Sequence, residues 1–451
     1  MADPPRNLAF DVGSLARAVN GAIVREGLLP IRRAAVDSRR VEPGNAFFAL
    51  PGERTDGHRF LVDAAQRGAA ALVVTSDVEL DGLGGASVIK VGDGLIALQQ
   101  ASAEWRNRFD PLVVAVTGSI AKTSTKEQVA EVLSESWNVL RNDANENNEI
   151  GLPLTMLRLA PEHEAAVFEM GMYTPGDISV LAALARPSIG VVTAVRGTHL
   201  SRAGSIDEIE RGKRELVEAL PPGGTAVLNA DDPRVARMAG AVPANVSVIT
   251  YGFDRAADVT ATEVESLGFD GMRFRLRAEG DEVEVTTPAL GRHSVHNGLA
   301  AAAVGLAAGM QLETIARGLA RPWNAPHRTT IVDFGPIKVL DDSYNASPDS
   351  MIAALDLLAS FETADRRVAI IGEMLELGDV AGGEHRRIER YARQSADLVM
   401  AVGPYEIAED REYLLSEIGQ RLRPGDVVLI KGSRGAAMEE FLPVLEGAAQ
   451  R

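Results

Sequence analysis

Short apolar runs alternate with stretches of helical periodicity in two separate parts of the chain. From residue 112 onward, the predicted strands are Leu112–Val116, Ala165–Met170, Ile189–Ala194 and Thr225–Leu228. From residue 337 onward they are Ile337–Leu340, Arg367–Ile371, Leu398–Val402 and Val427–Ile430, with helices at about Pro348–Ser360, Glu384–Gln394 and Ala436–Leu445. Such alternation is typical of doubly wound α/β sheets whose strands run parallel.

Other patterns fill the rest of the chain. Residues 258–290 alternate polar with apolar positions, as in Phe274-Arg-Leu-Arg277, which predicts antiparallel strands appended to the parallel sheet. The first ~110 residues mix short strands and helices, with a buried strand predicted at Ala69–Thr75. The segment Ala320–Arg328 contains two prolines and is predicted to be a linker.

These patterns predict an α/β protein of three domains. They span residues 1–110, 111–325 and 326–451. The first is an α/β domain, and the second is a P-loop-type mononucleotide-binding domain with appended antiparallel strands. The third is a smaller Rossmann-like domain. A chain of 451 residues is long enough for each domain to bury a core.

Composition excludes several classes of function. The net charge of −17 argues against nucleic acid as a general partner, although a local cationic cluster can still bind an anionic ligand. The chain has no cysteine, which excludes disulfides, thiolate metal sites and a cysteine nucleophile. No apolar run approaches the ~20 residues of a membrane span, and the N-terminus lacks signal-peptide features. We therefore expect a cytoplasmic protein, and nothing demands more than a monomer.

Lysine is rare in this chain. It occurs only at positions 90, 122, 126, 213, 338 and 431, while Lys and Arg together total 46. Because arginine replaces lysine almost everywhere, a remaining lysine is favoured where a compact amine that can lose its proton is needed. We give Lys122, Lys213 and Lys431 a raised functional expectation on this ground. Lys90, Lys126 and Lys338 are expected to be surface residues.

A phosphate-binding loop is predicted where the strand at Leu112–Val116 ends. A loop that contains Gly118, Ser119 and Lys122 follows this strand, and a helix is predicted from about Thr123 to Trp137. Backbone N–H groups of such a loop, together with the helix N-terminus, bind polyphosphate. Lysine adds a charge, and the threonine hydroxyl reaches Mg²⁺. The spacing is not a full Walker A sequence. The alternative is an ordinary strand-turn-helix with a solvent-facing lysine.

Further candidates are individually weak. Glu169 and His199 follow predicted strands at the edge where parallel sheets bind ligands, but a helix cap, an ion pair or a hydrogen-bonded loop histidine explains each alone. Lys213 falls in a helical stretch, and the pattern by itself favours a solvated face. The asparagines within residues 142–148 either read a heterocycle or fix a turn.

In combination, the motifs of this chain resemble those of the Mur ligase family over nearly its whole length. They are Val36-Asp-Ser-Arg39, Thr117-Gly-Ser with Lys122-Thr123, Asn145-Glu-Asn-Asn-Glu-Ile-Gly151, Glu169-Met-Gly171, His199-Leu200, Gly291-Arg-His-Ser-Val-His-Asn297, Leu340-Asp-Asp-Ser-Tyr-Asn345-Ala-Ser-Pro-Asp-Ser-Met351, Gly372-Glu-Met-Leu-Glu-Leu-Gly378 and Lys431-Gly-Ser-Arg434. The run from Asp342 to Met351 is similar to that of the members that add D-Ala-D-Ala to a UDP-N-acetylmuramoyl tripeptide in peptidoglycan synthesis. The N-terminal domain resembles the family's UDP-substrate domain.

The resemblance implies ATP-dependent amide formation through an acyl phosphate. It implies an ATP site at Gly118, Ser119, Ala121, Lys122, Thr123, Ser124, Asn148, His293, Asn297, Arg328 and Asp342. It implies two Mg²⁺ sites held by Thr123, Glu169, His199 and a CO₂-derived carbamate on Lys213. Ser38 and Arg39 are implied to bind the uridine nucleotide, and Asn345 and Ser347 the dipeptide. Lys122, His199, Lys213 and Arg328 are the implied catalytic residues, and Lys431 has no firm role.

Three positions depart from the family pattern. Ala121 and His327 stand where the family usually has glycine, and Ser294 where asparagine is common. If position 121 needs a positive φ, alanine costs on the order of 1 kcal/mol; if φ is negative, the change is nearly harmless. Ala121 is the one feature that favours a non-catalytic nucleotide-binding relative over an active ligase. A ligase of the same fold with another substrate, such as a folylpolyglutamate type, is a third hypothesis.

Overall fold

The computed structural model describes residues 10–52, 55–143, 145–197, 204–253, 256–323, 325–361 and 364–449. The chain forms two compact units. The first comprises Met1–Ala115, Trp137–Gly171 and Gly176–Ser188, and the second comprises Val116–Ser136, Met172–Pro175 and Ile189–Arg451. The described part contains three sheets, in agreement with an α/β protein built from three sheet-forming regions. The three domain ranges given above remain a prediction.

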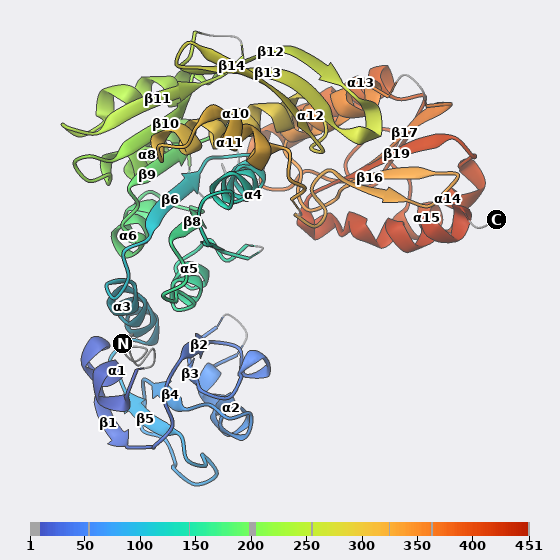
Figure 1. Cartoon of the computed structure of the whole chain (residues 1–451). Helices are drawn as coiled ribbons and strands as arrows, with labels where there is room; N and C mark the ends of the chain where they lie inside the picture. The colour runs from blue at the N-terminus through green and yellow to red at the C-terminus, as the bar shows by residue number, and fades with distance from the viewer. Residues whose placement is uncertain are drawn as a thin grey trace. The chain divides into compact units, whose positions relative to one another are not determined.

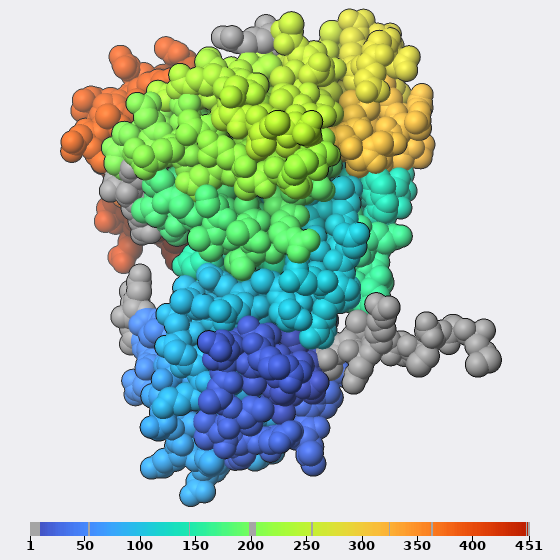
Figure 2. All heavy atoms as spheres, turned by 90° about the vertical axis from the view of Figure 1, so that its left-hand side faces the viewer, coloured from blue at the N-terminus to red at the C-terminus, as the bar shows by residue number. Residues whose placement is uncertain are grey.

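The N-terminal sheet has five strands in the order β1-β5-β4-β3-β2 (Figure 1). They are β1 (Ala22–Arg25), β2 (Arg33–Ala35), β3 (Asn45–Phe48), β4 (Ala71–Val74) and β5 (Ser87–Lys90). The helices of this region are α1 (Val12–Ala18), α2 (Leu61–Gln66) and α3 (Gly94–Arg106). Strand β4 is buried over its whole length, as the apolar run at 69–75 predicts. In the space-filling view the blue N-terminal residues form one closely packed body (Figure 2).

The central sheet has nine strands in the order β14-β13-β12-β11-β10-β9-β6-β8-β7. They are β6 (Leu112–Thr117), β7 (Val139–Arg141), β8 (Ala165–Glu169), β9 (Ile189–Val192), β10 (Thr225–Asn229), β11 (Ser247–Tyr251), β12 (Val259–Ser266), β13 (Met272–Ala278) and β14 (Asp281–Thr287). Strands β9, β10 and β11 pair in parallel, whereas β12, β13 and β14 pair antiparallel. The antiparallel extension predicted from the alternation in residues 258–290 is therefore confirmed.

Helices connect and cover the central strands. They are α4 (Lys122–Leu133), α5 (Gly151–Met156), α6 (Asp177–Ala185), α8 (Ile206–Glu218), α9 (Pro233–Ala236), α10 (Arg292–Ala307) and α11 (Leu312–Leu319). Within the second unit, α10 packs against α4 and crosses β10, β11 and β12. Ala300 to Ala303 are all buried and point in different directions around α10, and these small side chains permit this close approach. Helix α4 thereby rests on a second helix just behind the phosphate loop.

The C-terminal sheet has the order β15-β16-β19-β17-β18. Its strands are β15 (Thr330–Asp333), β16 (Lys338–Asp342), β17 (Arg366–Ile371), β18 (Leu398–Ala401) and β19 (Asp426–Lys431), and the last four run parallel. The helices are α12 (Pro348–Ala359), α13 (Ala381–Ser395), α14 (Arg411–Arg421) and α15 (Phe441–Ala449). The helix expected over residues 436–445 begins later, because short 3₁₀ turns occupy Arg434–Ala436 and Met438–Glu440.

Two separate cores flank the C-terminal sheet. Leu355 of α12 and Ile388 of α13 belong to one core, and Leu414 of α14 and Leu445 of α15 belong to the other. The α12–α13 pair and the α14–α15 pair accordingly lie on opposite faces of the sheet in Figure 1. The connections that follow β16 and β19, which are neighbouring strands, therefore leave toward opposite faces. Such a reversal creates a crevice at the carboxyl edge of a parallel sheet.

Candidate functional site

The loop between β6 and α4 is fixed by contacts with the end of β9. The Thr193 hydroxyl donates to the Ile120 carbonyl at 2.6 Å, and the Ser119 hydroxyl donates to the Arg196 carbonyl at 3.0 Å. A β-carbon at Gly118 would lie 1.8 Å from Thr193 Oγ1, so only glycine fits there. The amine of Lys122 turns back over the loop and donates to the Gly118 carbonyl at 2.9 Å. This geometry is a fixed turn with a cation folded over it, as a phosphate loop requires.

Ala121 adopts the left-handed conformation, with a φ of 66°. It is the N-cap residue of α4, and its side chain makes no capping hydrogen bond. Of the two alternatives for this position, the structure therefore selects the costly one, on the order of 1 kcal/mol relative to glycine. The adjoining Thr123 is buried, and Ser124 is half-buried, at the start of the helix.

Lys213 is buried rather than solvated, so the expectation from its local pattern was wrong. Only 4% of the residue is exposed, on the inner face of α8. Burial lowers the pKa of the Lys213 amine well below its ordinary value, and the positive charge of Lys122 lowers it further. Ile209, Lys213 and Leu216 are spaced four and three residues apart and so share one helical face. That spacing was the available signal for burial.

Lys126 also departs from the expectation that it lies at the surface. Its side chain is 0% exposed, and its amine lies 2.7 Å from the Glu127 carboxylate. Lys90 and Lys338 agree with the expectation, since each is partly exposed and pairs with an aspartate. Three of the six lysines, Lys126, Lys213 and Lys431, are thus buried, and the expectation of a surface position was wrong for Lys126.

Glu169 ends β8 in the first unit and is almost fully buried. Its carboxylate accepts from the Asn147 amide at 2.7 Å, and its backbone N–H donates to Asn142 Oδ1 at 2.8 Å. The Asn148 side chain accepts from the Gly151 backbone N–H at 2.9 Å and so fixes the start of α5. At least two asparagines of this loop therefore shape the backbone. Adenine contact by Asn148 remains a prediction.

Ser38 and Arg39 lie in a 3₁₀ turn of the first unit (Ser38–Arg40). Ser38 is buried and its hydroxyl bonds with Asp63, which lowers the pKa of that carboxyl. Arg39 is largely exposed and forms a forked pair with Asp37, at 2.9 Å and 2.7 Å. The next residue, Arg40, lies 3.7 Å from Glu146 in the asparagine-rich loop. The two residues implied to bind the uridine nucleotide thus lie in one turn, and the charge of Arg39 is already paired with that of Asp37.

A cluster of polar residues lies at the carboxyl edge of the C-terminal sheet. Lys431, at the end of β19, is buried and its amine contacts Asp342 Oδ2 at 2.5 Å and the Asn345 carbonyl at 2.9 Å. Asp342, at the end of β16, also accepts from the Thr329 backbone N–H at 3.1 Å. Lys431 therefore orients the carboxylate that the sequence implies for ribose. Sequence reasoning gave Lys431 no firm role because this pairing joins residues far apart in the chain.

His293 lies near this cluster, on the first turn of α10. Burial lowers the pKa of its imidazole, while the charge of Asp342 acts in the opposite direction and that of Lys431 adds to the lowering. Asn297 lies one turn further along α10 and is buried. The implied adenine and ribose residues of the second unit, His293 and Asp342, are thus brought into electrostatic contact. His199 lies outside the described residues.

The turn before β15 holds Arg328. His327 has a φ of 61°, and its ring contacts the buried Asp341 carboxylate at 2.7 Å. The His327 carbonyl accepts from the Tyr344 backbone N–H at 3.0 Å, and the Arg328 guanidinium lies 4.0 Å from the centre of the Tyr344 ring. The second departure from a family glycine thus also falls at a positive φ. Here a side-chain contact compensates for the strain.

The two implied dipeptide residues follow β16. Asn345 is exposed, and its side chain accepts from the Ala346 backbone N–H at 2.9 Å. Ser347 is buried as the N-cap of α12, where its hydroxyl bonds with that of Ser350 at 3.1 Å. Capping accounts for Ser347 without a ligand, and a dipeptide role for either residue remains a prediction.

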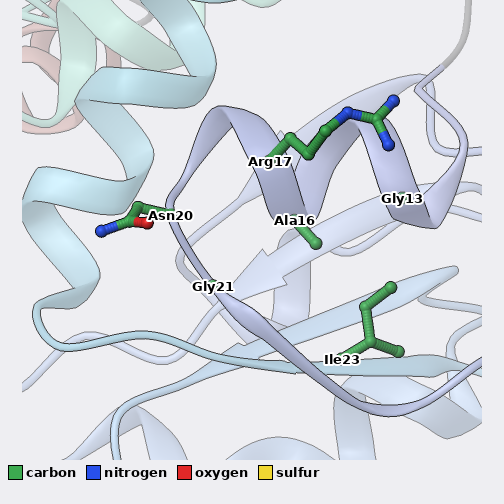
Figure 3. Close-up of a pocket in the computed structure, with 6 residues that line it drawn as sticks. All are labelled: Gly13, Ala16, Arg17, Asn20, Gly21 and Ile23. Carbon is green, nitrogen blue, oxygen red and sulfur yellow. The ribbon is translucent and has the colours of Figure 1, made fainter.

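The described residues contain no metal-ligand cluster, and their pocket is lined by residues other than the candidates. No group of three or more His, Asp or Glu side chains suited to a metal gathers in the described part of the chain. A pocket of about 480 Å³ lies against α1 and β1, lined by Gly13, Ala16, Arg17, Asn20, Gly21 and Ile23 (Figure 3). None of these lining residues is a candidate from the sequence. Over the described ranges, no helix is long and apolar enough to span a membrane.

Comparison with known proteins covers all of these regions. Residues 30–136 match the model described as Mur ligase family, catalytic domain; residues 116–305 match the Mur ligase middle domain; and residues 327–434 match the Mur ligase, glutamate ligase domain. The sequence is 34% identical to the UDP-N-acetylmuramoyl-tripeptide--D-alanyl-D-alanine ligase of Escherichia coli, over 97% of this chain and 99% of that protein. The chain belongs to the Mur ligase family.

Solved structures agree with this assignment. This Mur ligase superposes on a crystal structure of MurF from Acinetobacter baumannii with a TM-score of 0.88, at 30% identity over 97% of this chain and 99% of that chain. MurF from Thermotoga maritima, solved in complex with ADP, gives 0.82 at 26% identity over 93% and 98%. A folylpolyglutamate synthase from Mycobacterium tuberculosis gives 0.61 at 18% identity, with 78% of this chain and 95% of that chain covered, which shows a shared fold alone. This Mur ligase is an ATP-dependent enzyme that forms amide bonds.

Proposed function

We propose that this Mur ligase joins D-Ala-D-Ala to a UDP-N-acetylmuramoyl tripeptide in peptidoglycan precursor synthesis. The full-length likeness to the Escherichia coli ligase of that name supports the substrates. The observation that carries an active enzyme, rather than a non-catalytic relative, is the burial of Lys213 close enough to Lys122 for the charge of Lys122 to lower its pKa. Burial of an amine without a ligating role is costly, and a nucleotide-binding scaffold would gain nothing from it.

The proposed reaction has two steps. The terminal carboxylate of the tripeptide attacks the γ-phosphorus of ATP, which forms an acyl phosphate and releases ADP. The amine of D-Ala-D-Ala then attacks the acyl carbon, loses a proton, and expels inorganic phosphate as the amide bond forms. Because the carboxylate and the γ-phosphate repel one another, most of the catalysis lies in positioning and in neutralising charge. In this proposal Lys122 binds the β- and γ-phosphates, and Arg328 binds the γ-phosphate.

The remaining proposed roles follow the family pattern. Asn148 and Asn297 contact adenine, with His293 nearby. Asp342 binds ribose, and Ser38 with Arg39 binds the uridine nucleotide. Thr123 and Glu169 would hold one Mg²⁺, and His199 with a carbamate oxygen on Lys213 would hold the second. The hydroxyl, carboxylate and carbamate oxygens fit the preference of Mg²⁺ for oxygen ligands. Mg²⁺ bound by these residues would offset the negative charge of the phosphates.

The environment of Lys213 suits the formation of a carbamate on its amine. An amine must be neutral to attack CO₂, and the lowered pKa of Lys213 makes the neutral form accessible at a lower pH. The product is an anion, which the adjacent positive charge of Lys122 would stabilise. Arginine cannot perform this reaction, which agrees with the retention of lysine at a buried position in an arginine-rich chain.

Phosphate release tests the activity directly. Purified protein with ATP, Mg²⁺, UDP-N-acetylmuramoyl tripeptide and D-Ala-D-Ala should release phosphate only when both peptide substrates are present. Replacement of the tripeptide by a folate and of D-Ala-D-Ala by L-glutamate tests the folylpolyglutamate type of ligase. Release that stays at background with every acceptor would favour the non-catalytic alternative.

A further inference from the structure

Tyr344 brings two guanidinium groups together at the crevice of the C-terminal sheet. Tyr344 follows β16 and Arg434 follows β19, the two neighbouring strands whose connections leave toward opposite faces. The guanidinium carbon of Arg328 lies 4.0 Å from the centre of the Tyr344 ring, and that of Arg434 lies 5.2 Å from it. Three separate segments therefore converge where open α/β sheets bind their ligands.

The two arginines differ from the nearby lysine in their charge balance. Lys431 pairs with Asp342, but in the described ranges no carboxylate forms an ion pair with Arg328 or with Arg434. This is notable in a protein with a net charge of −17. Two guanidiniums next to one ring repel each other, and anions relieve that repulsion. Forked guanidinium donors are also the best protein partners for carboxylates and phosphates.

The backbone around Arg434 is held in place. The Ser433 hydroxyl accepts from the Leu375 backbone N–H at 2.8 Å, and the Arg434 carbonyl accepts from the Ala437 backbone N–H at 3.1 Å. On the other side, the bond from the Tyr344 N–H to the His327 carbonyl joins the tyrosine to the segment that carries Arg328. The backbone segments that carry the two arginines are therefore held in place by hydrogen bonds.

We propose that Arg434 binds the terminal carboxylate of the incoming D-Ala-D-Ala, an inference that rests on the function proposed above. The reacting amine of the dipeptide is uncharged, so its carboxylate is the only fixed charge available for recognition. Two extended residues span about 7 Å. The distances of 4.0 Å and 5.2 Å from the ring centre place the two guanidiniums no more than about 9 Å apart, a range that includes the length of a dipeptide. With Arg328 at the γ-phosphate, a dipeptide whose carboxylate contacts Arg434 places its amine near the acyl phosphate.

Binding of the carboxylate by Arg434 would also favour a dipeptide over a single amino acid. A single alanine spans only about 3.5 Å, so it cannot bind Arg434 and present its amine at the same reacting carbon. In this proposal Arg434 is a specificity-determining residue, and Tyr344 contacts both cations.

The test compares D-Ala-D-Ala with D-Ala-D-alaninamide, which lacks the carboxylate. The wild-type protein should prefer the acid by on the order of 100-fold in kcat/KM, as expected for loss of one partner of a charge pair. Arg434→Ala should lower kcat/KM for the acid by a similar factor, mainly through KM, and leave that for the amide unchanged. The KM for ATP should not change. Arg434→Glu should reverse the preference, and Arg434→Lys should retain part of it.

Arg423→Ala is the matched control, because Arg423 is an exposed arginine before the opposite end of β19. It should leave the acid-to-amide ratio at its wild-type value, and thermal unfolding of each variant checks the fold. Phosphate release by Arg434→Ala with an unchanged acid-to-amide ratio would overturn the role of Arg434 alone. Absence of release from the wild-type protein with either acceptor would instead remove the proposed function, and this inference with it.

Discussion

Two lysines, Lys213 and Lys431, are equally buried but have opposite electrostatic surroundings. Lys431 is 2% exposed, and its amine lies 2.5 Å from the Asp342 carboxylate, which is its ion-pair partner. Lys213 is 4% exposed, the described residues offer it no ion-pair partner, and the charge of Lys122 disfavours its protonation. Burial therefore does not define the role of a lysine. The two amines differ in their partners: a carboxylate contacts Lys431, whereas burial and a second cation lower the pKa of Lys213.

The largest expected effect comes from removal of the Lys213 amine. Lys213→Ala should lower kcat for phosphate release by about 10³-fold, equivalent to about 4 kcal/mol, because the proposed carbamate would no longer form. Short carboxylates such as acetate should restore part of the activity by supplying the missing oxygen ligand. ¹³C-labelled bicarbonate should give a carbamate resonance with the wild-type protein only. Full activity of the alanine variant would remove the distinction between the two lysines.

Removal of the Lys431 amine should instead be seen in stability. Lys431→Met leaves the Asp342 carboxylate without its cation and should lower the free energy of unfolding by about 3 kcal/mol. Lys431→Met with Asp342→Asn together should cost less than the sum of the two single changes, because each removes the same pair. Denaturant titration of the four proteins measures this coupling. Strict additivity would mean that the pair contributes nothing.

The pH dependence of stability should distinguish the two lysines further. The pKa of Lys213 is lower in the folded than in the unfolded protein, so the unfolded state binds more protons between the two values. Stability of the wild-type protein should therefore rise with pH through that window, up to the ordinary lysine pKa near 10.5. Lys213→Met should be more stable than the wild type at low pH, and this gain should shrink as the pH rises. Measurements in CO₂-free buffer without Mg²⁺ isolate the amine, and a gain that did not vary with pH would contradict the assignment.

The smallest expected effect concerns the residue before Lys122. Ala121→Gly should raise the free energy of unfolding by about 0.5–1 kcal/mol, because glycine adopts a positive φ without strain. Ala437→Gly is the control, since Ala437 has a φ of 45° and lies outside the phosphate loop. Both should stabilise to a similar extent. A lower KM for ATP in Ala121→Gly alone would show that the methyl group crowds the phosphates near Lys122.

The sequence predicted the sheets well because apolar runs report directly on burial. The strands at Leu112–Thr117, Ala165–Glu169 and Asp426–Lys431 begin and end close to the predicted limits. Buried polar residues were harder to predict. Lys126 was expected at the surface, and the local pattern of Lys213 favoured a solvated face, although Lys213 shares a helical face with Ile209 and Leu216. That helical spacing is a weak signal among the many charged residues of the same helix.

Contacts distant in the chain and backbone angles could not be deduced either. The pair formed by Lys431 and Asp342 depends on β19 lying beside β16, an order that only the packing of the sheet decides. Alanine at position 121 is compatible with either sign of φ, so the cost of that departure became clear only from the backbone. Family motifs identified candidate residues without saying which of them already have partners.

Residues 327–329 make three contacts with β16 and the residues that follow it, and these contacts restrict where the chain can bend. The His327 ring is tied to Asp341, its carbonyl to Tyr344, and the Thr329 N–H to Asp342. If the C-terminal sheet rotates, these residues must rotate with it. The hinge of such a motion consequently lies before His327 in the chain. Arg328 would therefore move together with the C-terminal sheet.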